Sequence, residues 1–350
     1  MNYADIINVT ENSALFSYEL DSAGFAVLSI DGREYKSVEA VGTGRFAVSG
    51  LEADHTYCAE LSGVKLEFTT LPAPEGEELG RFALISDPHV SLKDENRKGR
   101  FFVESGALMR EALEKAAALG AEFAVIPGDV TNAGTPEEYA YCKKILDTSP
   151  LPLRLLPGNH DHPEQGEWEK CFGERRWCFQ KYGYTWIGID SSSASLTSED
   201  AAVIRKHLDA GEKLIICSHY HFFSPPRINH KPGTGLRNLQ EHQELMEILQ
   251  KQHGMIYAGH QNICSCAGFG NIFQLNLPQP PQFPCEWILV RVFANGFYHQ
   301  AIPVNSEVLR QWSRRSSDAA AVFYNERQWK SEYRLQSFDQ SNFIWKGENK

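Results

Sequence analysis

Side chains of the types that bind metal ions follow five short apolar runs in this 350-residue sequence. Short apolar runs of this kind predict buried strands. In a layered α/β sheet, ligands gather beyond the carboxyl ends of the strands, so side chains far apart in the sequence can meet there. The candidates, in chain order, are Asp87, His89, Asp129, Asn159, His160, His219, His260 and Asn262.

These residue types suit a pair of divalent cations that hydrolyse a phosphoester. Two cations about 3.5–4 Å apart can clamp the attacking and the leaving oxygen of a displacement at phosphorus. One carboxylate must then reach both ions, and Asp129 is the natural candidate because Gly128 allows close backbone approach. Asp87 and His89 could reach one ion together. The donors for the other ion would be Asn159, His219 and His260.

The order of the motifs resembles that of the calcineurin-like metallophosphoesterase superfamily. The pieces are Asp-x-His, Gly-Asp-x-x-Asn, Gly-Asn-His-Asp, a later histidine and a Gly-His pair, and they span residues 82 to about 304. Each motif alone is weak evidence for a family, but the combination in this order is specific for this superfamily. The resemblance implies an α/β fold class with four layers, α/β/β/α, and a site for two divalent metal ions. Manganese, iron and zinc are the metals it suggests.

The resemblance also implies a role for each position. A hydroxide that bridges the two ions would attack phosphorus in line, and His160 would stabilise charge or protonate the leaving oxygen. The first ion would take Asp87, His89 and Asp129, and the second would take Asp129, Asn159, His219 and His260.

One position departs from the family pattern. The last motif usually ends in a second histidine that binds the first metal, and this chain has Asn262 there. An amide oxygen is a weaker ligand than imidazole for zinc or iron. With Asn262 as its fourth ligand, we expect the first position to be weaker, to prefer manganese or to lose its ion on washing.

Within the superfamily, residues 128–139 and 157–161 look most like cyclic-nucleotide and glycerol phosphodiesterases. Purple acid phosphatases also carry a β-sandwich ahead of the catalytic domain, but they have a tyrosine where this chain has Asn132, and they lack the histidine seen here as His89. We expect phosphodiester hydrolysis of a small-molecule substrate. The alternatives are a nucleotide pyrophosphate hydrolase with the same site, or a non-catalytic scaffold like the retromer subunit of this superfamily. The retained His160 argues against the scaffold.

Composition and net charge argue against nucleic acid binding, membrane insertion and an oxidising compartment. The net charge of −11 disfavours binding to a nucleic acid backbone. No segment approaches the roughly 20 apolar residues that span a bilayer, and we expect no secretory signal at the N-terminus. The eight cysteines are scattered, without a Cys-x-x-Cys pair, which fits a reduced compartment. The sequence thus predicts a cytoplasmic protein that does not bind membranes.

Three regions follow one another along the chain. Residues 1–72 alternate apolar and polar side chains between short turns, which predicts a small all-β sandwich. The stretch 51–57 resembles the tyrosine corner of fibronectin type III domains, through Tyr57. Residues 80–304 would form the metallophosphoesterase domain. Residues 305–350 are polar but rich in aromatic side chains; they either dock on the protein itself or contact a partner, including a second copy of this chain.

Helical spacing appears at four places in the catalytic region. Residues 103–119 form one helix, a second starts with the capping sequence Thr135–Glu138, and others follow Ser198 and Asn238. Two late strands, at 287–292 and 297–304, are expected to add an antiparallel edge to a sheet.

Overall fold

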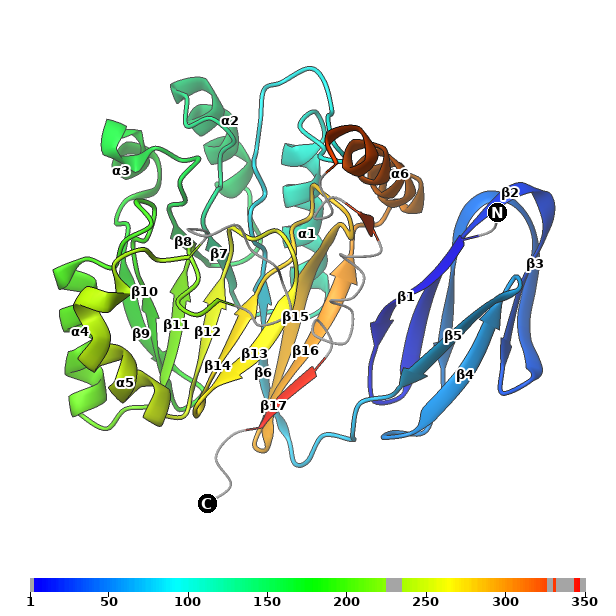
Figure 1. Cartoon of the computed structure of the whole chain (residues 1–350), viewed down its shortest axis with the longest axis horizontal. Helices are drawn as coiled ribbons and strands as arrows, with labels where there is room; N and C mark the ends of the chain where they lie inside the picture. Colours follow the sequence, from blue (N-terminus) through cyan, green and yellow to red (C-terminus); the bar gives the residue numbers. More distant parts are fainter. Residues whose placement is uncertain (1–2, 225–234, 326–329, 332–342, 347–350) are drawn as a thin grey trace.

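The structure is a computed structural model that describes residues 3–224, 235–325, 330–331 and 343–346. An all-β region comes first and lies beside a larger α/β body (Figure 1). The all-β region holds the strands β1 (Tyr3–Val9), β2 (Ser13–Ile30), β3 (Arg33–Ser49), β4 (Thr56–Leu61) and β5 (Val64–Thr69).

The long strand β2 pairs with three of the four other strands of the all-β region. Its first half pairs with β1, its second half pairs with β4, and β3 follows it along both halves. The strand β2 runs on through a register shift in its pairing with β3, between Leu20 and Gly24. The hydroxyl of Tyr57 accepts a hydrogen bond from the Glu52 backbone N–H at 2.8 Å, as in a tyrosine corner. The likeness to fibronectin type III domains stays a prediction.

Two six-stranded sheets form the body. The first has the order β17-β16-β15-β6-β7-β8, and the second has the order β13-β14-β12-β11-β10-β9. The first sheet consists of β6 (Glu78–Leu84), β7 (Ala124–Pro127), β8 (Leu153–Leu156), β15 (Glu286–Phe293), β16 (Gly296–Pro303) and β17 (Phe343–Lys346). The second consists of β9 (Trp177–Lys181), β10 (Tyr184–Gly188), β11 (Leu214–Ser218), β12 (Gly254–Ala258), β13 (Ser265–Phe269) and β14 (Ile272–Asn276).

The predicted four layers are confirmed. Aromatic side chains from both sheets, among them Phe82, Trp186 and Tyr257, form one core between the sheets. A second core joins the first sheet to α1 (Ser105–Ala118) and α2 (Pro136–Leu146), and a third joins the second sheet to α4 (Ser198–Asp209) and α5 (Gln243–Lys251). These are the four helices that the sequence predicted. The shorter elements are η1 (Pro163–Gln165), α3 (Glu167–Phe172) and η2 (Leu239–His242).

The C-terminal region completes the first sheet. We expected β15 and β16 at its edge, but β17 pairs outside β16 and makes both of them interior strands. Trp345 of β17 is buried in the core between the sheets. Docking of this region on the protein itself is thus confirmed for β17, while the aromatic residues Trp329, Tyr333 and Phe338 lie outside the described part of the chain.

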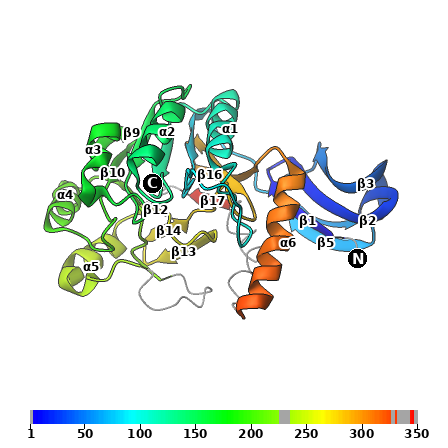
Figure 2. The same cartoon turned by 90° about the horizontal axis from the view of Figure 1, so that it is seen from above.

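The helix α6 (Glu307–Tyr324) lies between the body and the all-β region (Figure 2). Its Arg310 is fully buried and donates to Asp5 of β1, at 3.2 Å for Nη1. Its Glu307 accepts hydrogen bonds from Ser17 and Arg45 of the all-β region. Buried polar groups are matched across this contact, so the all-β region is held in one position against the helix. None of the described helices combines the length and the apolar composition of a membrane-spanning segment.

Candidate metal centre

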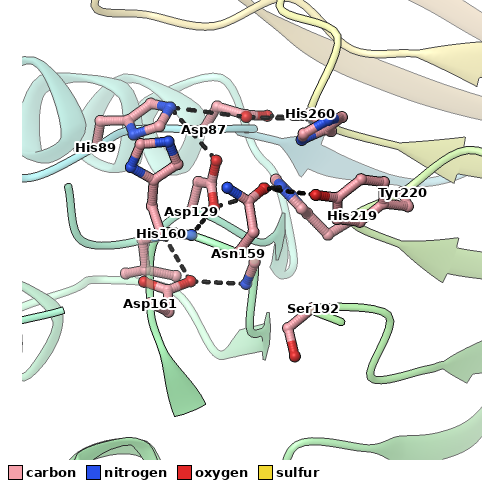
Figure 3. Close-up of polar contacts among 12 residues, drawn as sticks. Asp87, His89, Asp129, Asn159, His160, Asp161, Ser192, His219, Tyr220 and His260 are labelled. Atoms are coloured by element: carbon pink, nitrogen blue, oxygen red, sulfur yellow. Dashed lines mark hydrogen bonds and ion pairs between the residues drawn. The ribbon is translucent and has the colours of Figure 1, made fainter. Parts of the chain in front are cut away.

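The candidate side chains meet beyond the carboxyl ends of five strands. Asp87 and His89 follow β6, Asp129 follows β7, and Asn159 and His160 follow β8, and these three strands are parallel neighbours. His219 and His260 follow β11 and β12, which are parallel neighbours in the other sheet. The ends of the two sheets face one another, so the side chains point into one space (Figure 3).

Several of these residues have a backbone conformation that L-amino acids rarely adopt. The φ angles are 49° at Asp87, 44° at His89, 49° at Asp129, 66° at His260 and 57° at Asn262. Each such residue costs about 1–3 kcal/mol, and such residues cluster at functional sites, where the rest of the fold holds them.

Glycines before the candidate ligands make room for other candidate ligands. A Cβ atom at Gly128 would collide with the ring of His219, and one at Gly158 would collide with the Asp129 carboxylate. A Cβ atom at Gly259 would lie within 2.6 Å of an Asp87 oxygen. The turns can therefore approach one another closely only because these three positions lack side chains.

Asp129 lies between two groups of ligand atoms. Its Oδ2 is 3.6 Å from His89 Nε2, and its Oδ1 is 3.3 Å from His219 Nε2. One group contains His89, Asp129 and His160, the other contains Asp129, His219 and His260, and within each group the ligand atoms lie within 4.8 Å of one another. A carboxylate whose two oxygens face different histidines can bridge two cations.

The surroundings of His219 show that a cation fits the second group. His219 Nδ1 must carry a proton, because it is 3.0 Å from the Pro127 carbonyl oxygen, which can only accept. The Nε2 lone pair then faces Asn159 Oδ1 at 3.1 Å and Asp129 Oδ1 at 3.3 Å. Three electron-rich atoms can converge in this way only around a positive charge, either a proton or a metal ion.

Burial and the neighbouring charges also shift the pKa values of the three histidines. Burial lowers the pKa of His219, but the Asp129 carboxylate outweighs it and raises this pKa to about 9. Burial and the neighbouring His219 lower the pKa of His260 to about 3. Burial and the nearby Arg100 hold the pKa of His89 well below its usual value. His89 and His260 are thus neutral, which is the form that binds metal.

Asp87 faces the same space. Its carboxylate is 3.8 Å from His89 Nε2 and accepts the backbone N–H of His260, at 3.1 Å for Oδ2. Burial raises the pKa of Asp87 to about 6, against the effect of His219, and the charge of Asp129 adds to the increase. This carboxylate joins the turn after β6 to the turn after β12, which brings the two sheets together at the site.

His160 and Asp161 are fixed by the turns around them. His160 Nδ1 donates to the Asn132 carbonyl at 2.7 Å, and the His160 backbone N–H donates to Asp129 Oδ1 at 2.8 Å. The buried Asp161 carboxylate accepts the backbone N–H groups of Thr131 and Gly158, both at 2.7 Å. Asp161 thereby joins the turn after β7 to the turn after β8.

Sequence reasoning missed three residues that shape this site. Asp161 stands in the Gly-Asn-His-Asp motif, but its joining role could be found only in three dimensions. Tyr220, next to His219, donates from its hydroxyl to Asn159 Oδ1 at 3.2 Å. Arg100 Nη1 is 3.3 Å from His89 Nε2, although Arg100 lies in a loop without periodic pattern. Asn262 lies two residues after His260, and its role as a ligand stays a prediction.

Two known proteins are similar to this chain in sequence. The chain is 29% identical over 154 residues to glycerophosphodiester phosphodiesterase GpdQ of Enterobacter lignolyticus, covering 37% of this chain and 52% of the relative. It is 25% identical over 178 residues to a probable glycerophosphodiester phosphodiesterase GpdQ of Arcobacter nitrofigilis, covering 45% of this chain and 63% of that relative. The chain therefore spans about half to two thirds of these relatives.

A solved structure supports the fold. A dimetal phosphatase from Danio rerio superposes with a TM-score of 0.52 at 12% identity, over 64% of this chain and 96% of the phosphatase. The sequence itself matches the family described as "Calcineurin-like phosphoesterase" over residues 80–264, more than half of the chain. The chain belongs to the calcineurin-like phosphoesterase family.

Proposed function

We propose that the protein is a phosphodiesterase that uses two divalent metal ions. The observation that carries this proposal is the position of Asp129, whose two oxygens face His89 and His219 on opposite sides. The preference for diesters is supported by the two relatives named as glycerophosphodiester phosphodiesterases.

The proposed ligands divide into two sets that share Asp129. Asp87 and His89 would complete the first position, with Asn262 as a weaker fourth donor. The other position would take Asn159, His219 and His260. Two cations, when bound, would lower the pKa of a water molecule and neutralise charge on the phosphoryl oxygens.

His160 would act on the leaving group. Its Nδ1–H bond to the Asn132 carbonyl fixes the orientation of the ring and leaves Nε2 as the nitrogen that can reach a substrate. A ring held in this way can donate a proton or a hydrogen bond to the oxygen that departs from phosphorus. The bond from the His160 backbone to Asp129 keeps the ring next to the shared carboxylate.

The His160→Ala variant separates catalysis from metal binding. We expect kcat to fall by about 10²–10⁴, the usual contribution of a general acid or base, while the metal content is retained because Asp129 and the other ligands remain. Turnover and elemental analysis of the same sample would check this. Loss of both metal ions together with activity would instead make His160 a ligand.

A substrate panel tests the function itself. The metal-depleted protein would be reloaded with manganese and offered an aryl phosphodiester, an aryl phosphomonoester, glycerophosphodiesters, cyclic nucleotides and nucleotide diphosphate sugars. We expect turnover of diesters to exceed that of monoesters and pyrophosphates. Faster cleavage of the diphosphate sugars would favour a pyrophosphatase, and no turnover with manganese, iron or zinc would contradict an enzymatic role.

A further inference from the structure

Arg100 lies beside the proposed first metal position, and the surrounding loop holds it there. The backbone of Arg100 pairs with that of Arg97, with N···O distances of 2.9 and 3.2 Å. The preceding residue, Gly99, donates to Ser316 of α6 at 3.0 Å and accepts from Ser313 of α6. The guanidinium therefore starts from an anchored point in the backbone.

The contact between Arg100 and His89 uses the atom that a metal ion would need. A guanidinium only donates hydrogen bonds, so His89 Nε2, 3.3 Å from Arg100 Nη1, must accept with its lone pair. The same Nε2 is 3.6 Å from Asp129 Oδ2 and 3.8 Å from Asp87 Oδ1. One lone pair cannot serve both the guanidinium and a metal ion.

Unlike the rings of His160 and His219, the ring of His89 has no hydrogen bond at Nδ1 to a described residue that would fix its orientation. His160 and His219 each donate from Nδ1 to a backbone carbonyl. His89 Nδ1 is buried and has no hydrogen-bond partner within the described ranges. Metal-binding histidines usually donate the other N–H to an acceptor, which strengthens them as ligands. His89 lacks this support.

The two positions differ in charge as well. Burial lowers the pKa of Arg100, and the nearby carboxylates of Asp87 and Asp129 oppose this shift. Around the second position, no lysine or arginine of residues 3–224 or 235–325 is hydrogen-bonded to Asn159, His219 or His260. Within these ranges, only the first position has an arginine or lysine side chain at one of its ligands.

We propose that Arg100 competes with the first metal ion for His89, so that the two positions fill in order. The second position, with Asn159, His219 and His260, fills first. The first position fills only when the guanidinium leaves His89 Nε2, and until then Arg100 supplies positive charge to the site. Arg100 also lines a hollow of about 480 Å³ with Phe102 and Lys93, which gives the displaced guanidinium room. This inference rests on the proposed two-metal function.

The experiment counts bound metal without substrate. The metal-free full chain would be titrated with manganese, and bound ions would be measured by equilibrium dialysis and by the paramagnetic resonance signal of coupled manganese pairs. We expect the wild type to bind one equivalent tightly and a second at least about tenfold more weakly, a typical effect of groups beside a ligand. In Arg100→Met, which has no donor or charge, the second equivalent should bind about tenfold more tightly.

A control variant and a double variant show whether the change in manganese binding comes from the contact between Arg100 and His89. Arg97→Met is the control, because Arg97 is exposed and pairs with Glu95, and it should titrate like the wild type. In the double variant Arg100→Met/His89→Ala the second equivalent should disappear, which assigns it to His89. If Arg100→Met does not fold, Arg100→Leu, which also has no donor or charge, replaces it with the same expectation.

Several outcomes would overturn the inference. Two equally tight equivalents in the wild type would contradict the competition while leaving the two-metal function intact. The competition would also be contradicted if the second manganese equivalent bound to Arg100→Met as it does to the wild type, or more weakly. Failure of every variant and of the wild type to bind any divalent ion would contradict the proposed function as well.

Discussion

At the scale of single residues, the glycines before the candidate ligands give the clearest predictions. A Cβ atom at Gly158 would clash with both the side chain and the backbone nitrogen of Asp129. We expect Gly158→Ala to displace the shared carboxylate and to lower kcat/KM by about 10²-fold, the typical cost of a 1 Å misplacement. Turnover and metal content of the purified variant would check this.

Gly24→Ala is the matched control for that variant. Gly24 lies in β2, and a Cβ atom there would have no heavy atom within 4 Å. Its activity and metal content should equal those of the wild type. Unchanged metal content and rate in Gly158→Ala would show that the turn after β8 can move away from Asp129 without consequence.

Asp161 should contribute to stability rather than to chemistry. Its two carboxylate oxygens accept from the backbone of Val130, Thr131 and Gly158. An amide has one acceptor oxygen, so Asp161→Asn would leave donors without a partner, at about 1–3 kcal/mol each. Urea unfolding would measure the loss. Asp147→Asn, at an exposed residue paired only with Lys143 on α2, should change the free energy of unfolding by less than about 0.5 kcal/mol.

The candidate site could be predicted from the sequence only where a residue follows a strand. Asp87, Asp129 and His219 do so, because their short apolar runs mark strand ends, and the structure brings them together. Arg100 could not be predicted, because it reaches His89 from a loop whose path depends on α6. Asp161 could not be predicted as a joining residue, because the donors to its carboxylate include backbone N–H groups of another turn.

At the scale of elements, α6 shows why a sequence pattern can fail to predict a helix. Its buried positions include Arg310, Gln311, Ser313 and Ser317, which are polar. An apolar stripe at helical spacing is the main signal of an amphipathic helix, and here polar side chains occupy the buried face. The helix α2, by contrast, buries apolar residues behind a Thr135 cap and was predicted correctly.

The strand β17 should stabilise the whole first sheet. Its Trp345 is 1% exposed and packs against Phe297 and Tyr184, whose ring centroids are 5.1 and 5.3 Å away. We expect Trp345→Ala to lower the free energy of unfolding by about 3–5 kcal/mol, as for other buried large side chains. Chemical denaturation would test this. The control is Phe323→Ala on α6, where the side chain is 81% exposed and a change below about 0.5 kcal/mol is expected.

At the scale of the whole molecule, the contact between the all-β region and α6 should make stability depend on pH. Glu286 of β15 is buried near Arg310 and Asp5, and burial raises its pKa to about 8, although Arg310 opposes the shift. The unfolded chain has a pKa of about 4.3 for this group. The folded state therefore holds the proton more tightly, and the stability from Glu286 is lost as the pH rises from about 4.3 to about 8.

The variant Glu286→Gln tests this dependence. It mimics the protonated side chain, so its free energy of unfolding should fall less than that of the wild type between about pH 5 and pH 8. The difference should not exceed about 1.4 kcal/mol per pH unit. Glu67→Gln, at an exposed residue of β5, should keep the wild-type slope. Equal slopes in wild type and Glu286→Gln would show that Glu286 is already ionised in the folded protein.

The separate core of the all-β region has a consequence for biosynthesis. This region closes its own hydrophobic cluster from residues 4–68, whereas its polar partners on α6 come from residues 307–315. Domains that leave the ribosome first generally fold first. The all-β region can thus fold while most of the chain is still being translated, and Asp5 and Ser17 then stay hydrated until α6 emerges and docks on a finished surface.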